Sequence, residues 1–199
     1  YDFTQGLLLD DSSQDVVFLN VVFELTKDYR ALIREAYRVL RPGGLIHIRD
    51  FDTVIYDPIV PSQLARRTHP TVCRLLDIMR EKLAEMGADP QTFEHLPSWL
   101  ASEPNGEAGF EHIKIMTKMF PAYPHHSAIC GHKVDTRIAP YMEHLVAMTF
   151  RDFTSILCDA GMKTDEANAL IEAAIREFRH PDNCALMKLI CMYAVKRGT

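Results

Sequence analysis

The spacing of hydrophobic residues changes from strand-like to helix-like and back between residues 15 and 50. Residues 16–19 form a continuous apolar run, which predicts a strand covered on both faces. Over residues 29–40 the apolar side chains recur every three or four positions, and arginines fill most of the other face, which predicts an amphipathic helix. Residues 45–50 form a second strand. The order predicts one β-α-β unit of a parallel, doubly wound sheet.

The residues at both ends of this helix are typical of helix termini. Thr26 or Asp28 can cap its first turn, because a short side-chain oxygen accepts a hydrogen bond from an unpaired backbone N–H. Pro42, Gly43 and Gly44 end the helix and turn the chain into the strand at 45–50.

The chain beyond residue 50 begins irregularly and then regains helix and strand patterns. Residues 51–70 contain three prolines and predict an irregular segment on the substrate side of the sheet. Helices are expected at 72–86, as a short turn leading to 96–100, at 138–160, and from a cap at Thr164 to 179; strands are expected at 110–120 and 185–195. We expect one incomplete α/β domain over 1–199, with an inserted cap segment at about 51–108.

Composition excludes several classes of protein. The hydrophobic fraction is 47% and the charged fraction 25%, as in ordinary globular proteins. A net charge of −5 argues against a nucleic-acid partner, because phosphate binding needs a basic surface. No apolar run is long enough for a membrane span, so a membrane partner is not expected either.

The cysteines indicate a cellular compartment, and the first residue indicates whether the chain is complete. Five cysteines, without C-x-x-C spacing, predict reduced and mostly buried thiols in an intracellular protein. We expect the cytoplasm, with the nucleus as the alternative. The chain begins at Tyr1 and not at Met, and so we expect a processed or truncated chain.

Three segments of the first fifty residues resemble class I S-adenosylmethionine-dependent methyltransferases: residues 2–7 (DFTQGL), the strand beginning at Asp15, and residues 38–44 (RVLRPGG). Three later segments resemble the LaeA-like fungal type of this family: residues 96–100 (LPSWL), 109–113 (GFEHI) and 192–196 (MYAVK).

The resemblance implies a Rossmann-like, seven-stranded sheet of which this chain holds the C-terminal part, with helical insertions on the substrate side. The strands would be the fourth to the seventh, in the order 4-5-7-6, with the last pair antiparallel. The implied cofactor is S-adenosylmethionine. Asp2 and Phe3 match the positions that contact its adenine, and Asn20 and Val21 match those that border its methionine moiety.

Two features of the family are missing from this sequence. The glycine-rich loop after the first strand and the acidic ribose ligand after the second have no counterpart, although close backbone approach to the ligand needs glycine there. Residues 121–126 (PAYPHH) replace a glycine-tryptophan turn. Without the first strand, residues 16–19 would be an uncovered apolar edge. We therefore expect a missing N-terminal half, or a partner chain at this edge.

Candidate substrate residues lie where strands end. Asp50 and Phe51 follow the strand at 45–50, and open α/β sheets bind ligands at the carboxyl ends of their strands. Trp99 is equally a core anchor or a pocket wall, and His47 is more typical of a core histidine. No catalytic residue is assigned, because methyl transfer relies mainly on alignment of the reactants.

The histidines at 125, 126 and 132 do not predict a metal site. Adjacent histidines point apart, and no carboxylate or cysteine sits at ligand spacing beside them. A solvated or pocket-lining loop is the simpler interpretation.

Three functions fit these patterns. The first is S-adenosylmethionine-dependent methyl transfer to a small, natural-product-like acceptor. The second is a non-catalytic binding or regulatory module on a methyltransferase-like scaffold. The third is an enzyme such as a cyclase that keeps the scaffold without transferring methyl groups. Whether the chain is an enzyme is left open.

Overall fold

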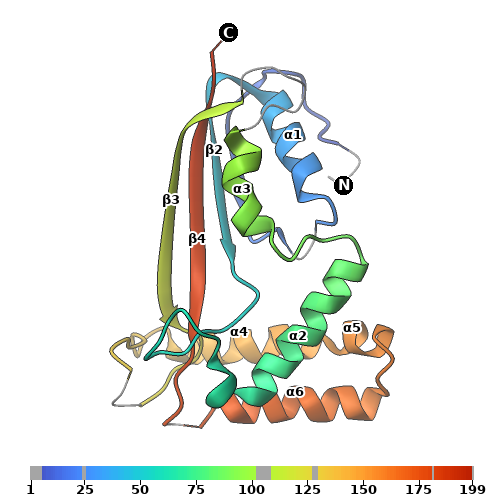
Figure 1. Cartoon of the computed structure of the whole chain (residues 1–199), viewed down its shortest axis with the longest axis vertical. Coiled ribbons are helices and arrows are strands. Elements are labelled where there is room, and N and C mark those ends of the chain that lie inside the picture. Colours follow the sequence, from blue (N-terminus) through green and yellow to red (C-terminus); the bar gives the residue numbers. More distant parts are fainter. Residues whose placement is uncertain (1–5, 24–25, 102–108, 127–129, 181, 199) are drawn as a thin grey trace. The chain divides into compact units, whose positions relative to one another are not determined.

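A computed structural model describes residues 6–23, 26–101, 109–126, 130–180 and 182–198. It is a mixed α/β structure with one four-stranded sheet (Figure 1). Its elements are β1 (Gln14–Asn20), α1 (Tyr29–Val39), β2 (Leu40–Phe51), the 3-10 helix η3 (Ala65–Arg67), α2 (Pro70–Glu85), α3 (Thr92–Ala101), β3 (Phe110–Pro121), α4 (Ala139–Asp152), α5 (Thr154–Asp159), α6 (Thr164–Phe178) and β4 (Leu186–Lys196).

The predicted β-α-β unit is confirmed. The turn expected at 42–44 before a strand at 45–50 is wrong, because β2 begins at Leu40, directly after α1, and includes Pro42, Gly43 and Gly44. β1 pairs in parallel with β2, with Val17 opposite Ile46 and Leu19 opposite Ile48. Helix α1 begins after Asp28, whose carboxylate accepts a hydrogen bond from the Ala31 N–H at 2.7 Å. Of the two expected caps, Asp28 is therefore the one used, because its oxygen satisfies an N–H that the first turn leaves unpaired.

The sheet order is β1-β2-β4-β3, and β4 runs antiparallel to β2. This is the order expected for four successive strands numbered 4-5-7-6, whereas their assignment to a longer, seven-stranded sheet stays a prediction. β1 lies at one edge of the sheet, as expected for the segment 16–19.

One expectation about β1 is wrong. Its side chains were expected to be covered on both faces, but Val16 and Phe18 are 54% and 50% exposed. Val17 and Leu19, which point to the opposite face, pack into a core with residues of α1 and α3. The helices of this core thus cover one face of β1 and leave the alternate side chains in solvent.

The chain divides into two compact units. Unit 1 comprises residues 1–51, 83–117 and 189–199, and unit 2 comprises 52–82 and 118–188. The core of unit 1 is built on β2 and β4 with α1 and α3, and its fully buried side chains include Ile46, Ile48, Leu96 and Leu100. The single domain with an insertion at about 51–108 stays a prediction.

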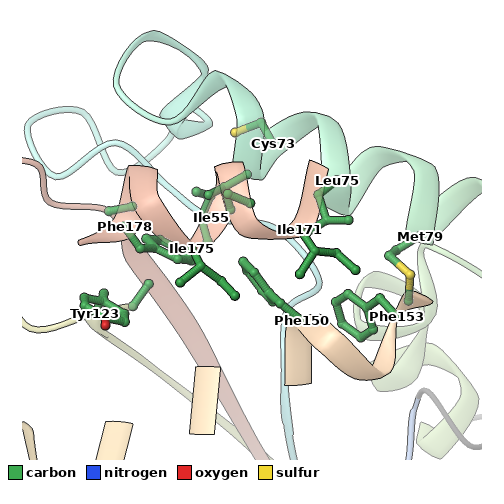
Figure 2. Close-up of a cluster of buried hydrophobic side chains, with 14 of the residues drawn as sticks. Ile55, Cys73, Leu75, Met79, Tyr123, Phe150, Phe153, Ile171, Ile175 and Phe178 are labelled. Carbon is green, nitrogen blue, oxygen red and sulfur yellow. The ribbon is translucent and has the colours of Figure 1, made fainter. Parts of the chain in front are cut away.

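The core of unit 2 is formed by helices (Figure 2). Leu75 and Met79 from α2, Phe150 from α4, and Ile171 and Ile175 from α6 point toward one another. Phe178 extends this core through ring contacts with Phe150 and with Tyr123.

The single helix expected at 138–160 is wrong, because it is broken into α4 and α5 at Phe153. The Phe153 N–H donates to the Phe150 carbonyl, three residues back, and the Thr154 hydroxyl donates to the Arg151 carbonyl at 2.8 Å. A side chain that donates a hydrogen bond to a helix carbonyl competes with the backbone hydrogen bonds of the helix, which favours a break at this point. The cap expected at Thr164 is also wrong, since Thr164 is the first residue of α6 and Lys163 precedes it without a capping side chain.

The cysteines differ from expectation in part. Cys130 and Cys184 are joined by a disulfide, whereas Cys73, Cys158 and Cys191 are free thiols. Among the described residues, no helix is long and apolar enough to cross a membrane.

Candidate functional site

The chain turns sharply where β1 ends. Val21 has a φ of 52°, in the left-handed region that β-branched residues rarely adopt. Its N–H donates to the Arg49 carbonyl at 2.8 Å, which ties the turn to β2. Such a conformation costs about 1–3 kcal/mol and persists only where the surroundings impose it. The turn after β1 is therefore held by the rest of unit 1.

Asp50, near the end of β2, holds this turn. Its side chain is 3% exposed, and one carboxylate oxygen accepts hydrogen bonds from the N–H groups of Val22 and Phe23, each at 3.0 Å. The other oxygen accepts from the Phe51 N–H at 2.9 Å. Burial raises the pKa of Asp50, and the three N–H groups oppose that rise without cancelling it.

Tyr29, at the start of α1, lies beside the same carboxylate. It is buried against the rings of Phe23 and Phe93. Burial raises its pKa, and the nearby charge of Asp50 adds to the effect. Among the described residues its hydroxyl has no hydrogen-bond partner, although buried hydroxyls are normally paired.

Asn20 lies on the solvent side of the turn. Its side-chain oxygen accepts a hydrogen bond from the Arg49 Nε at 2.8 Å, and the Arg49 guanidinium lies 5.7 Å from the centre of the Phe18 ring. Both Asn20 and Val21 are exposed. The end of β1 thus presents a polar side chain and a strained peptide at the carboxyl edge of the parallel pair.

The structure brings four of the seven predicted site residues together. Asn20, Val21, Asp50 and Phe51 lie at the adjacent ends of β1 and β2. Trp99, on α3, packs against the core of unit 1 and contacts the His95 ring, with the ring centres 5.7 Å apart. Asp2 and Phe3 are outside the described residues. The binding roles of all seven stay predictions.

A polar group in unit 2 was not predicted. The Tyr56 hydroxyl donates to the Asp52 carboxylate and accepts from the Lys188 ammonium at 2.7 Å, and Lys188 lies 2.6 Å from Asp52. Burial and the bond to Asp52 raise the pKa of Tyr56. Burial alone would lower the pKa of Lys188, but its bonds to Asp52 and Tyr56 outweigh burial and raise it. Tyr56 is therefore a hydrogen-bond donor at neutral pH and not a ready base.

No sequence signal could have found this group. Tyr56 and Lys188 are 132 positions apart, and each residue alone is typical of a half-buried strand or loop.

Comparison with known proteins adds information on the first quarter of the chain. Residues 2–48 match a family model described as a methyltransferase domain. Over 45 residues the chain is also 44% identical to an arsenite methyltransferase of Aquipseudomonas alcaligenes, with 23% of this chain and 13% of that protein covered. This region is methyltransferase-like. It contains β1, α1 and most of β2, and hence Asn20 and Val21.

A longer similarity joins the chain to a fungal protein. It is 27% identical over 188 residues to the secondary metabolism regulator laeA of Coprinopsis cinerea, covering 90% of this chain and 43% of the relative. The chain therefore spans less than half the length of both curated relatives.

Similarity to solved structures is weak. Phosphoethanolamine N-methyltransferase 2 of Haemonchus contortus, in complex with S-adenosylhomocysteine, matches with a TM-score of 0.43 at 14% identity. The match covers 96% of this chain and 35% of that one. A score of this size carries no argument about function.

Proposed function

We propose that this chain is part of an S-adenosylmethionine-dependent methyltransferase of the LaeA-like type, which methylates a small-molecule acceptor. The observation that carries the proposal is that the methyltransferase-like stretch and the turn after β1 occupy the same part of the chain. The stretch that matches the methyltransferase model, residues 2–48, includes the strained turn that Asp50 holds at the carboxyl edge of β1 and β2. Ligands of open α/β sheets bind at this edge.

The residues present fit one side of the cofactor. Asn20 and Val21 would border its methionine moiety, a role that the resemblance implies and that their exposure at the turn supports. Asp2 and Phe3 would contact the adenine, a role that rests on sequence alone. The glycine-rich loop has no counterpart in the 199 residues, so the opposite wall would come from additional sequence or from a partner chain.

Asp50 would act through the turn and not on the acceptor. Its carboxylate already accepts three backbone hydrogen bonds, which occupy both oxygens. It therefore positions Val22 and Phe23, while Phe51 and Trp99 remain candidates for contact with the acceptor. When bound, the cofactor supplies an activated methyl group on its sulfonium, and the protein needs mainly to align the acceptor with it.

The test is calorimetric binding of S-adenosylhomocysteine to the complete protein that contains this chain. Asp50→Ala removes the carboxylate that accepts from the Val22 and Phe23 N–H groups, and we expect it to weaken binding about tenfold or more, since the turn would move. Asp15→Ala is the matched control, because Asp15 is an exposed carboxylate at the other end of β1, paired with Arg41 at 2.7 Å. Failure of the complete protein to bind, or equal affinity for Asp50→Ala, would overturn the proposal.

A second function is favoured by one observation. The relative that covers 90% of this chain is named a regulator of secondary metabolism, so a methyltransferase-like module that binds a partner without methyl transfer is the alternative. Incubation with S-adenosylmethionine labelled on its methyl group separates the two. Transfer of label to small molecules of a cell extract supports the enzyme, and cofactor binding without any transfer supports the regulatory module.

A further inference from the structure

Two cysteines and a histidine of unit 2 converge on one point. The sulfurs of Cys130 and Cys184 and a ring nitrogen of His125 all lie within 4.8 Å of one another. Cys130 follows β3 and Cys184 precedes β4, so the fold brings together side chains that are 54 positions apart. Both cysteines are buried, at 3% and 4% exposure, and His125 is partly buried. The group is separate from the ends of β1 and β2 in sequence and in unit.

We propose that the reduced chain binds a zinc ion through His125, Cys130 and Cys184. The structure shows the two cysteines in the oxidised state, as a disulfide, and reduction would free two thiolates beside the imidazole. Zinc binds sulfur at about 2.3 Å and histidine nitrogen at about 2.0–2.1 Å, so the ligand atoms of a tetrahedral site lie roughly 3.5–3.8 Å apart. The ligand atoms are at most 4.8 Å apart in the disulfide form. After reduction the two sulfurs would move apart and the nitrogen would move about 1.3 Å closer to them or less, distances that side-chain rotation covers.

The surroundings of the group suit a thiolate–imidazole site. Soft thiolates and imidazole are the ligands that zinc prefers over harder cations. His125 is hydrogen-bonded to the backbone of His132, and a metal-ligating histidine usually makes such a second bond, which fixes the orientation of its ring. Leu186, Tyr56 and Met119 pack around the cysteines and limit the access of water.

Three protein ligands leave the fourth coordination position of a tetrahedral zinc ion open. Among the described residues, no fourth histidine, cysteine or carboxylate belongs to the group. Water or an added ligand would fill that position, as in zinc sites that keep an open coordination position.

Metal binding and the disulfide exclude each other. Binding converts two thiols to thiolates and releases two protons, and no electron is transferred. In the oxidation, two electrons pass from the two sulfurs to an oxidant such as a disulfide, which is reduced to two thiols. The S–S bond then forms and the zinc is released. A phosphine reductant in water reverses this step, since the phosphine is oxidised to its oxide and two thiols form.

The first experiment compares the two redox states of the unmodified chain. After incubation with zinc chloride and desalting, we expect about one zinc per chain in the phosphine-reduced protein and nearly none in the disulfide form, by atomic emission. Cobalt chloride should give the thiolate charge-transfer and intense visible bands of tetrahedral cobalt in the reduced form alone. Equal zinc content in both states, or none in the reduced state, would overturn the proposal.

The second experiment assigns the ligands. Cys130→Ser and Cys184→Ser should each weaken zinc binding by about 100-fold or more, and His125→Ala by about tenfold or more. The matched controls are Cys158→Ser, at a free thiol of the same unit, and His126→Ala, at the exposed neighbouring histidine. Binding that survives Cys184→Ser, or that is lost equally in the controls, would contradict the assignment. If circular dichroism shows that a variant is unfolded, the comparison of redox states decides.

Discussion

Single carboxylates hold backbone N–H groups in both units, and two of them, Asp50 and Asp57, are buried. Asp50 accepts three backbone N–H groups in unit 1. In unit 2, Asp57 accepts from the N–H groups of Ile59 and Val60, and Glu177 accepts from those of Thr71 and Val72 at the start of α2. An N–H that is buried without a partner costs about 1–3 kcal/mol, and so each of these carboxylates specifies a local backbone path.

His69, a buried residue of unit 2, should make the chain sensitive to acid. It is 1% exposed and lies against the Phe178 ring, and burial lowers its pKa from 6.5 to about 4. Between pH 6.5 and about pH 4, His69 therefore binds a proton in the unfolded chain but stays neutral in the folded chain. We expect the free energy of unfolding to fall by up to about 3 kcal/mol as the pH drops from 6.5 to 4.

Urea unfolding followed by circular dichroism between pH 4 and pH 7 measures this effect. His69→Gln, which does not titrate, should lose less stability over this range than the parent, whereas His144→Gln, at an exposed position on α4, should follow the parent. Parallel pH profiles for the parent and His69→Gln would contradict the prediction.

At the scale of elements, the first part of β2 depends on two glycines. Gly43 has a φ of 76°, a conformation that side chains rarely adopt. Gly44 has no room for a side chain, since a Cβ there would lie 2.8 Å from the Arg41 carbonyl oxygen and 3.2 Å from the Asp15 carbonyl oxygen. Close approach of β1 to this part of β2 therefore requires glycine, and the register between β1 and β2 shifts at this point.

Gly44→Ala should destabilise unit 1 by about 2 kcal/mol, because the closest atom, the Arg41 carbonyl oxygen, belongs to the backbone and the chain must shift to admit a methyl group. The only tryptophan, Trp99, is in unit 1, so its fluorescence during urea unfolding reports on this unit. Gly198→Ala is the control, since a Cβ there meets no atom within 4 Å. Equal midpoints for the two variants would refute the argument.

At the scale of the whole molecule, the edge strand of the sheet leaves apolar side chains in solvent. Val16 and Phe18 are about half exposed on β1, which pairs with β2 on one side only. An apolar edge of this kind promotes pairing with another chain. This fits the expectation that a further segment or a partner chain covers β1.

Charged residues on β1 should therefore reduce association of the isolated chain. We expect concentration-dependent association in sedimentation velocity, and the double variant Val16→Lys with Phe18→Lys should lower it about tenfold, because like charges would face each other across the paired edges. Leu145→Lys, at a 65% exposed apolar position on α4, should leave it unchanged. A larger effect of Leu145→Lys would assign the contact to α4 instead.

Local patterns in the sequence were enough to predict most elements. The apolar run at 16–19, the helical spacing at 29–40 and the predicted strand at 45–50 identified β1, α1 and most of β2, because each pattern is local to one short segment. The order of the four strands followed from the resemblance. Sequence reasoning also placed Asn20, Val21, Asp50 and Phe51 at strand ends, which is where they lie.

Tertiary structure alone decided the contacts between distant segments. The break at Phe153, the uncovered face of β1, the three hydrogen bonds of Asp50 and the convergence of His125, Cys130 and Cys184 have no local signature. Periodicity reports whether a side chain is buried, but not which partner it meets. That partner depends on how strands and helices from distant parts of the chain pack. The polar contacts described above, such as those of Asp50 and of His125, form only through this packing.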